Sequence, residues 1–202
     1  MKNLYAAVFL SLAAQFATAT PINLVQNGDF EIAVAGPGLV PNWTYSGGDS
    51  YFGVDADYIG SPGARPGLVF YDGAATNTGY LSQSIATTAG MSYILEFDLQ
   101  RWAGTNNPVS NLASVSFGGA SVFYQADTAG DWTHFTVGGL VGGPGAFTLL
   151  EFANLNVFDF NQLDNVSLVE KDVRTDIPEP ATPLVFAAAL GALTLVRRRR
   201  PR

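Results

Sequence analysis

The sequence predicts an all-β domain, a β-sandwich of the jelly-roll kind, with an apolar segment on each side of it. Apolar and polar residues alternate in several short runs, glycine-rich breaks separate these runs, and no long segment has apolar residues at helical spacing. We expect roughly eight or more short strands with turn signals about every 8 to 12 residues, a spacing typical of sandwiches and jelly rolls.

The N-terminal segment contains the three parts of a secretory signal peptide. Lys2 precedes an apolar run over residues 4–16, and Ala17-Thr18-Ala19 follows it. A positive region, an apolar region and a small-x-small site in this order are typical of exported proteins. We predict a signal peptide over residues 1–19, cleaved at the site that Ala17 and Ala19 define. A buried N-terminal helix is the alternative, but the run lacks the polar face that such a helix needs.

Residues 20–170 form the predicted β-sandwich domain. Its clearest strand covers residues 92–99, where Tyr93, Leu95, Phe97 and Leu99 alternate with more polar neighbours. This period of two is that of a strand with one buried face. Shorter alternations predict strands around residues 114–117, 134–137 and 165–168. No internal repeat of about 20 to 50 residues is present, which argues against a solenoid or propeller.

Charge and composition exclude several classes of function. Residues 20–176 contain four cationic and sixteen acidic residues, a net charge of −12. Such a surface repels phosphate, so we expect no nucleic-acid partner. The chain has no cysteine, which excludes disulfides, thiol catalysis and cysteine-based metal sites. No nucleophile elbow or nucleotide-binding loop is present, and the acidic residues suggest no glycosidase pair. We therefore predict that the protein is not an enzyme.

The C-terminal segment contains a proline-flanked glutamate, an apolar run and a basic end. The linker over residues 171–180 ends in Pro178, Glu179 and Pro180, and residues 181–196 carry no charge. As a helix at 1.5 Å per residue this run is about 24 Å long, slightly shorter than the ~30 Å hydrocarbon core. Snorkelling arginines in the tail over residues 197–202 compensate for the difference. The positive-inside rule places this tail in the cytoplasm and the domain outside.

The order of these C-terminal parts resembles the PEP-CTERM sorting signal of Gram-negative bacteria. Its parts are a Pro-Glu-Pro motif, a transmembrane segment and a terminal basic cluster, here Arg197, Arg198, Arg199 and Arg200. The resemblance implies an exosortase-type membrane protease as partner, with the motif as its processing site. A plain C-terminal anchor preceded by a chance proline pair is the alternative.

Three further motifs resemble galactose-binding-like jelly rolls, the fold of many carbohydrate-binding modules. They lie at residues 24–31, 80–97 and 163–168. The resemblance implies that the first and last strands are neighbours and that Glu31 and Asp164 contribute to a structural calcium site. Calcium prefers six to eight oxygen ligands in irregular geometry. The alternative is that Asn27-Gly28-Asp29 forms a turn and that Asp164 caps a strand.

Aromatic residues near polar ones suggest where a sugar would bind. A pyranose ring needs a flat aromatic face, with amides or carboxylates beside it for its hydroxyl groups. Trp43 and Tyr45 lie among acidic and amide residues, and Trp102 is followed by Asn106 and Asn107. We predict these three aromatic residues as ligand-binding candidates, although aromatic residues in all-β domains are more often part of the core.

Together these observations predict an exported, non-enzymatic protein associated with extracellular polysaccharide. After processing it is either membrane-anchored at the cell envelope or released to the surface matrix. A dedicated carbohydrate-binding module is the first alternative, and a small jelly-roll glycan hydrolase is the second.

Overall fold

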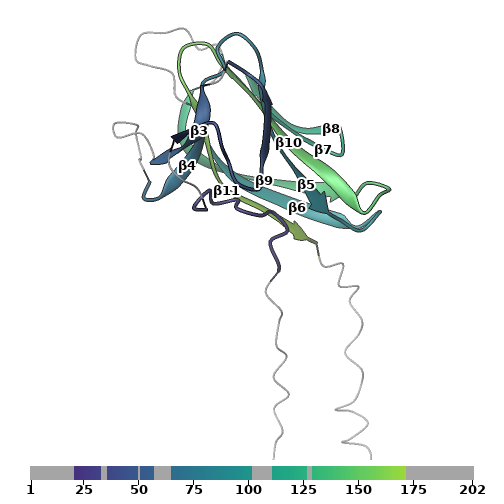
Figure 1. Ribbon diagram of the computed structural model, residues 1–202. Helices are drawn as coiled ribbons and strands as arrows, with labels where there is room; N and C mark the ends of the chain where they lie inside the picture. The colour runs from purple at the N-terminus through teal and green to yellow at the C-terminus, as the bar shows by residue number, and fades with distance from the viewer. Residues whose placement is uncertain are drawn as a thin grey trace, which may run out of the picture.

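The structure, a computed structural model, describes residues 21–32, 36–49, 51–56, 65–101, 111–126 and 129–171. The described residues form a two-layer sandwich of antiparallel strands (Figure 1). Their strands are β1 Gly36–Pro37, β2 Thr44–Gly47, β3 Phe52–Ala56, β4 Leu68–Asp72, β5 Gly79–Ala86, β6 Ser92–Arg101, β7 Asn111–Phe117, β8 Ala120–Ala126, β9 Gly130–Val141, β10 Phe147–Asn156 and β11 Asn161–Glu170. The predicted all-β sandwich is confirmed.

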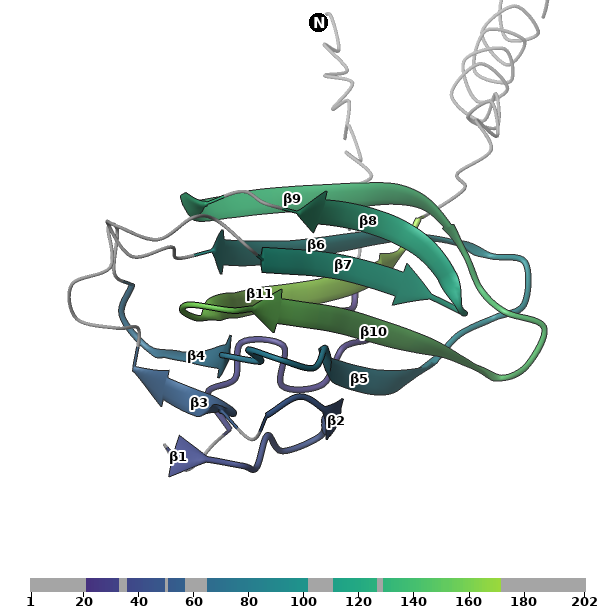
Figure 2. The same cartoon turned by 90° about the horizontal axis from the view of Figure 1, so that it is seen from above.

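The strands form two sheets. The six-stranded sheet has the order β1-β3-β4-β11-β6-β9, and the five-stranded sheet has the order β2-β5-β10-β7-β8. Chain neighbours such as β10 and β11 lie in different sheets, so the chain crosses repeatedly between the layers (Figure 2). The last strand, β11, lies inside its sheet between β4 and β6.

The core lies between the two sheets and follows the alternation in the sequence. Tyr93, Leu95, Phe97 and Leu99 of β6 are all buried, as the period of two predicts. Phe97 contacts Phe152 of the opposite sheet at a centroid distance of 5.4 Å. Burial of such apolar and aromatic side chains is the main favourable contribution to folding.

The segment before β1 packs along the end of β11. The amide of Leu24 donates to the carbonyl of Leu168, and the amide of Val166 donates to the carbonyl of Gly28, both at 2.8 Å. A Cβ atom at residue 28 would lie 2.0 Å from the carbonyl oxygen of Val166. This close backbone approach explains the glycine in the Asn-Gly-Asp motif.

No helix in the described part of the chain is long and apolar enough to cross a membrane. The predicted signal peptide over residues 1–19 and the predicted transmembrane segment over residues 181–196 lie outside the described residues.

Candidate functional site

The outer face of the five-stranded sheet presents two tyrosines in one row. Backbone pairing places five residues side by side across this sheet, one from each strand: Ser46, Tyr80, Ala153, Ser114 and Tyr124. Tyr80 is 36 % exposed and Tyr124 is 66 % exposed. Ala153 and Ser114 have small side chains, so the sheet surface between the two tyrosine rings carries no bulky group.

A second row on the same face is polar. It contains Thr44, Ser82, Glu151, Ser116 and Ser121, again one residue from each strand. Glu151 is half-buried and lies between the serines of β5 and β7. We call these two rows together the tyrosine face.

The tyrosine face combines the groups that a sugar chain needs. Tyr80 and Tyr124 are three strand spacings apart, or about 14 Å, which leaves room for a short run of pyranose rings between and over them. Four hydroxyl groups and one carboxylate in the adjacent row can donate to or accept from sugar hydroxyls. The face therefore has flat apolar surfaces next to directional polar groups, the combination that small-ligand sites use.

The prediction that Trp43 offers a sugar platform is wrong. Trp43 is only 9 % exposed and belongs to the core. Its ring packs against Phe30 at 5.8 Å and Phe152 at 6.1 Å, and its Nε1 donates to the carbonyl of Asn27 at 3.0 Å. Both the ring faces and the polar atom are thus used inside the fold.

Tyr45 also has a structural role in this geometry. Its ring stacks on Phe52 at a centroid distance of 3.6 Å. Its hydroxyl donates to the carboxylate of Asp72 at 3.0 Å. Asp72 is fully buried, and the amide of Ala74 donates to the same oxygen. Burial raises the pKa of Asp72 to about 6, although these two hydrogen bonds favour the charged form.

Glu31 and Asp164 have different partners. Oε1 of Glu31 accepts from the amide of Leu68 at 2.8 Å, and Glu31 is exposed. Asp164 is buried, and the charged groups that affect its pKa are Asp98, Arg65 and Asp29. No group of three or more histidine, aspartate or glutamate residues able to hold a metal occurs among the described residues. Calcium also binds backbone carbonyls and water, so the two-carboxylate calcium site stays a prediction.

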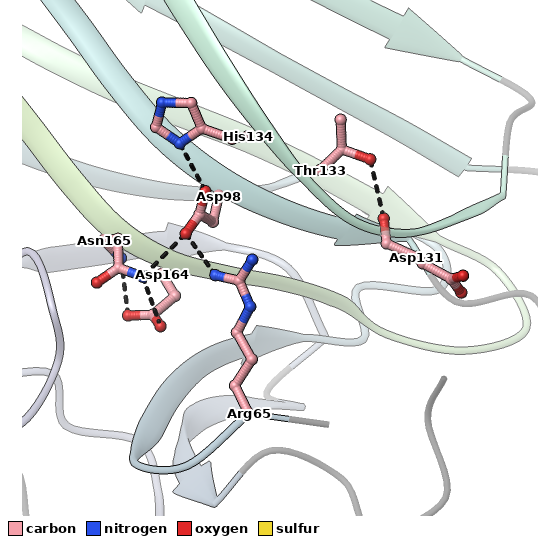
Figure 3. A network of polar contacts seen from close by, with 7 residues as sticks. All are labelled: Arg65, Asp98, Asp131, Thr133, His134, Asp164 and Asn165. Atoms are coloured by element: carbon pink, nitrogen blue, oxygen red, sulfur yellow. Dashed lines mark hydrogen bonds and ion pairs between the residues drawn. The ribbon is translucent and has the colours of Figure 1, made fainter. Parts of the chain in front are cut away.

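Asp164 belongs to a polar network on the outer face of the six-stranded sheet (Figure 3). It lies opposite Asp98 of β6. Asn165 donates from its side chain to both carboxylates, at 2.9 Å to Asp98 and 3.2 Å to Asp164. Arg65 forms an ion pair with Asp98, and Nδ1 of His134 lies 2.8 Å from the other Asp98 oxygen.

The network gives the two carboxyl groups different pKa values. Burial alone would raise the pKa of Asp98, but hydrogen bonds from Asn165, Arg65 and His134 outweigh burial and lower it. Burial raises the pKa of Asp164 to about 6 against the hydrogen bond from the Asn165 amide. Each of the four carboxylate oxygens accepts at least one hydrogen bond. These bonds stabilise two buried acids and join β6, β9 and β11 to the segment before β4.

Several predicted residues lie outside the described part of the chain. They are the ligand candidate Trp102, the signal-cleavage residues Ala17 and Ala19, and the sorting residues Pro178, Glu179, Pro180, Arg197, Arg198, Arg199 and Arg200.

Comparison with known protein families identifies the C-terminal signal. Residues 176–200 match the PEP-CTERM protein-sorting motif. This match confirms the predicted sorting signal and implies export of the protein. A comparison with curated protein sequences finds no relative.

Comparison with solved structures shows the fold. The carbohydrate-binding module TmCBM61, solved with β-1,4-galactotriose, has a TM-score of 0.55 and 18 % identity over 74 % of this chain and 99 % of that chain. The adhesin domain K1 of Lys-gingipain from Porphyromonas gingivalis W83 has a TM-score of 0.51 and 17 % identity over 71 % and 96 %. The enzymatically active domain of tailspike protein 4 of bacteriophage CBA120 has a TM-score of 0.50 and 21 % identity over 74 % of this chain. The matched part spans only 21 % of that tailspike chain.

Sequence reasoning did not find the tyrosine face. Tyr80 and Tyr124 lie in separate short strands, and nothing in the sequence near either residue links it to the other. The available signal was alternation: in β5 the residues Tyr80, Ser82 and Ser84 are exposed or half-buried and alternate with buried residues. Only strand pairing shows that these positions and Tyr124 share one row.

Proposed function

We propose that this protein is a non-catalytic glycan-binding protein that is exported and sorted to the cell surface. The single observation that carries the binding proposal is the row in which Tyr80 and Tyr124 flank Ala153 and Ser114. The likeness to carbohydrate-binding modules shows the fold alone, so the binding proposal depends on this face.

Each tyrosine of the row suits a sugar ring. The aromatic ring offers an apolar face for the C–H groups of a pyranose, and its hydroxyl remains available to water or to the ligand. The small residues between the tyrosines leave the backbone of β10 and β7 accessible from above. A glycan lying across the strands then contacts one ring near each end and the hydroxyl row along its side.

The charge of the site supports a neutral glycan as ligand. Glu151 lies in the middle of the polar row, and residues 20–176 carry a net charge of −12. A carboxylate accepts hydrogen bonds from neutral sugar hydroxyls, whereas it repels uronate or sulfate groups. We therefore propose neutral polysaccharides of the extracellular matrix as the ligand class.

Affinity electrophoresis tests the binding proposal. The full chain is run through gels containing neutral xylan, galactan or glucan, or an acidic uronan, in wild type and in Tyr80→Ala, Tyr124→Ala and the double variant. We expect retardation by at least one neutral glycan and a more than tenfold weaker affinity in the double variant, which corresponds to about 1.4 kcal/mol or more. Tyr51→Ala is the matched control, because Tyr51 is 66 % exposed but lies outside the tyrosine face.

Two results would contradict the proposal. Retardation that survives the double variant would place binding elsewhere on the chain. Release of reducing sugar ends from any retarded glycan would show an enzyme and favour a small jelly-roll hydrolase.

We further propose that the C-terminal sorting signal determines where the protein is located. An exosortase-type protease recognises the Pro178-Glu179-Pro180 motif while residues 181–196 hold the precursor in the membrane. The basic tail stays in the cytoplasm, and the folded domain lies outside. Before cleavage the domain is tethered to the membrane, and afterwards it is retained at the envelope or released into the matrix.

A further inference from the structure

The connection between β9 and β10 is uncharged and exposes apolar side chains. No charged residue or histidine occurs from Phe135 to Leu150, in a domain whose net charge is −12. Val141 is 56 % exposed, Phe147 is 64 % exposed and Leu149 is 45 % exposed. We call these three residues, with the intervening loop, the apolar tip.

The apolar tip lies at the end of the sandwich where the chain leaves toward the sorting signal. The amide of Lys171, which follows β11, donates to the carbonyl of Ser92 at 2.8 Å, and Ser92 pairs with Val141. The end of β11 and Val141 are thus separated by one strand, or about 10 Å across the sheet. Figure 2 shows the β9–β10 connection and the end of β11 at the same end of the sandwich.

The tether to the apolar C-terminal run is short. Nine residues separate Lys171 from Ala181, so a fully extended chain spans at most about 36 Å between them. When residues 181–196 lie in the bilayer, the apolar tip therefore stays within reach of its outer surface.

The tyrosine row lies toward the other end of the sandwich. Tyr80 is the second residue of β5, whereas Ala86 at the other end of β5 pairs with Phe147. Residues 80 and 86 are six positions apart along an extended strand, which corresponds to about 20 Å. A domain that rests on its apolar tip keeps the tyrosine row on the side open to the matrix.

We propose that the apolar tip rests on the outer surface of the lipid bilayer to which the chain is tethered. This inference depends on the membrane tethering in the proposed function. An acidic domain is repelled by anionic lipid headgroups, whereas an uncharged tip approaches them without this cost. Val141, Phe147 and Leu149 lose contact with water at the interface, which favours this orientation.

Single-cysteine labelling tests the contact, because the chain has no cysteine of its own. The full chain is reconstituted in phosphatidylcholine vesicles with an environment-sensitive fluorophore at Phe147→Cys, at Tyr124→Cys or at Ala188→Cys. Lipids carrying a spin label near the headgroup then quench any fluorophore at the interface. We expect at least a twofold stronger quenching at residue 147 than at residue 124, together with a blue-shifted emission.

The three labels separate the possible failures. Quenching at residue 188 by deeply labelled lipid, with residue 147 no more quenched than residue 124, would overturn the inference and leave the tethering intact. No quenching at residue 188 would overturn the tethering and the inference with it. A blue shift at residue 147 without lipid quenching, which grows with protein density, would overturn the inference in favour of a second copy of the chain.

A surface variant provides the matched control. In the triple variant Val141→Ser, Phe147→Ser and Leu149→Thr, a fluorophore at exposed Pro144→Cys should lose at least half of its quenching relative to the same label in the wild-type tip. The melting temperature of the triple variant should stay unchanged, because all three side chains are exposed. Undiminished quenching at residue 144 would contradict a role for these side chains.

Discussion

Tyr45 and Asp72 are joined by a 3.0 Å hydrogen bond in which the phenol donates to a fully buried carboxylate. The other Asp72 oxygen is buried and has no hydrogen-bond partner among the described residues. Gly79 faces both groups, and a Cβ atom there would lie 2.1 Å from the Tyr45 hydroxyl and 2.4 Å from that oxygen. Because this buried carboxylate has only the Tyr45 hydroxyl and the Ala74 amide as donors within the described part of the chain, loss of either should lower the stability of the domain.

Tyr45→Phe should destabilise the domain without weakening glycan binding. Loss of the phenol leaves Asp72 with one donor, and an incompletely satisfied buried acceptor costs about 1–3 kcal/mol. Urea unfolding followed by tryptophan fluorescence measures this change, with Tyr124→Phe as an exposed control that should be neutral. If Tyr45→Phe instead keeps full stability and loses glycan retardation, Tyr45 is a ligand residue, as the sequence predicted.

The domain should be more stable at pH 5 than at pH 7.5. Burial raises the pKa of Asp72 and of Asp164 to about 6 in the folded state, so the native protein holds these protons more tightly than the unfolded chain. The free energy of unfolding then falls as pH rises from about 4 to about 6, by on the order of 3 kcal/mol for each group. The pKa of Asp98 is lowered, so its stabilising effect is lost only below this range.

Asp72→Asn separates this effect from general charge repulsion. The variant should flatten the dependence of the melting temperature on pH, whereas Asp55→Asn, at an exposed position of β3, should leave the slope unchanged. A wild-type domain whose stability rises between pH 5 and pH 7.5 would show that neither buried acid is protonated as described.

Calcium binding stays a prediction of the resemblance to galactose-binding-like domains. If Asp164 and Glu31 contribute ligands, a hundredfold excess of calcium over its Kd adds about 2.7 kcal/mol of stability, a melting shift of several degrees. Scanning calorimetry with calcium and with chelator measures the shift in wild type, Asp164→Asn and Glu31→Gln. A shift lost in both variants supports the two-carboxylate site, and one retained in both places the ion elsewhere. An unchanged wild-type melting temperature removes the site.

Neutralising the basic tail should disturb sorting. Replacing Arg197 through Arg200 by glutamine removes the charge that fixes the cytoplasmic end of the precursor. We expect accumulation of unprocessed chain, seen by intact-mass analysis of membrane fractions, while Arg174→Gln processes normally. A mature surface protein that retains both Met1 and Arg202 would contradict cleavage at either end.

The fold was predictable from the sequence where a single strand shows a clear alternation of apolar and polar residues. The alternation from Tyr93 to Leu99 gave β6, and the residues that it assigned to the core are buried there. Sequence pattern did not show β8, which has no fully buried face, or the short strands β1 and β2. The segment before β1 shows no regular strand pattern, although it pairs with β11 over two backbone hydrogen bonds.

The binding site was less predictable, because it depends on contacts between distant parts of the chain. Trp43 looks available in sequence, since its neighbours are polar, yet Phe30 and the carbonyl of Asn27 enclose it. Tyr80 and Tyr124 are 44 positions apart and meet in one row only through the pairing of β5, β10, β7 and β8. A local pattern shows which side of a strand is exposed, but the register between strands decides which exposed residues are neighbours.

The position of β11 inside its sheet determines how the domain bears mechanical load. If the domain is tethered and holds a polysaccharide, as we propose, tension enters it at Lys171, directly after β11. Near this point β11 is bonded to β6 on one side and to residues 24–28 on the other. Detaching the strand therefore requires breaking hydrogen bonds along both of its edges together.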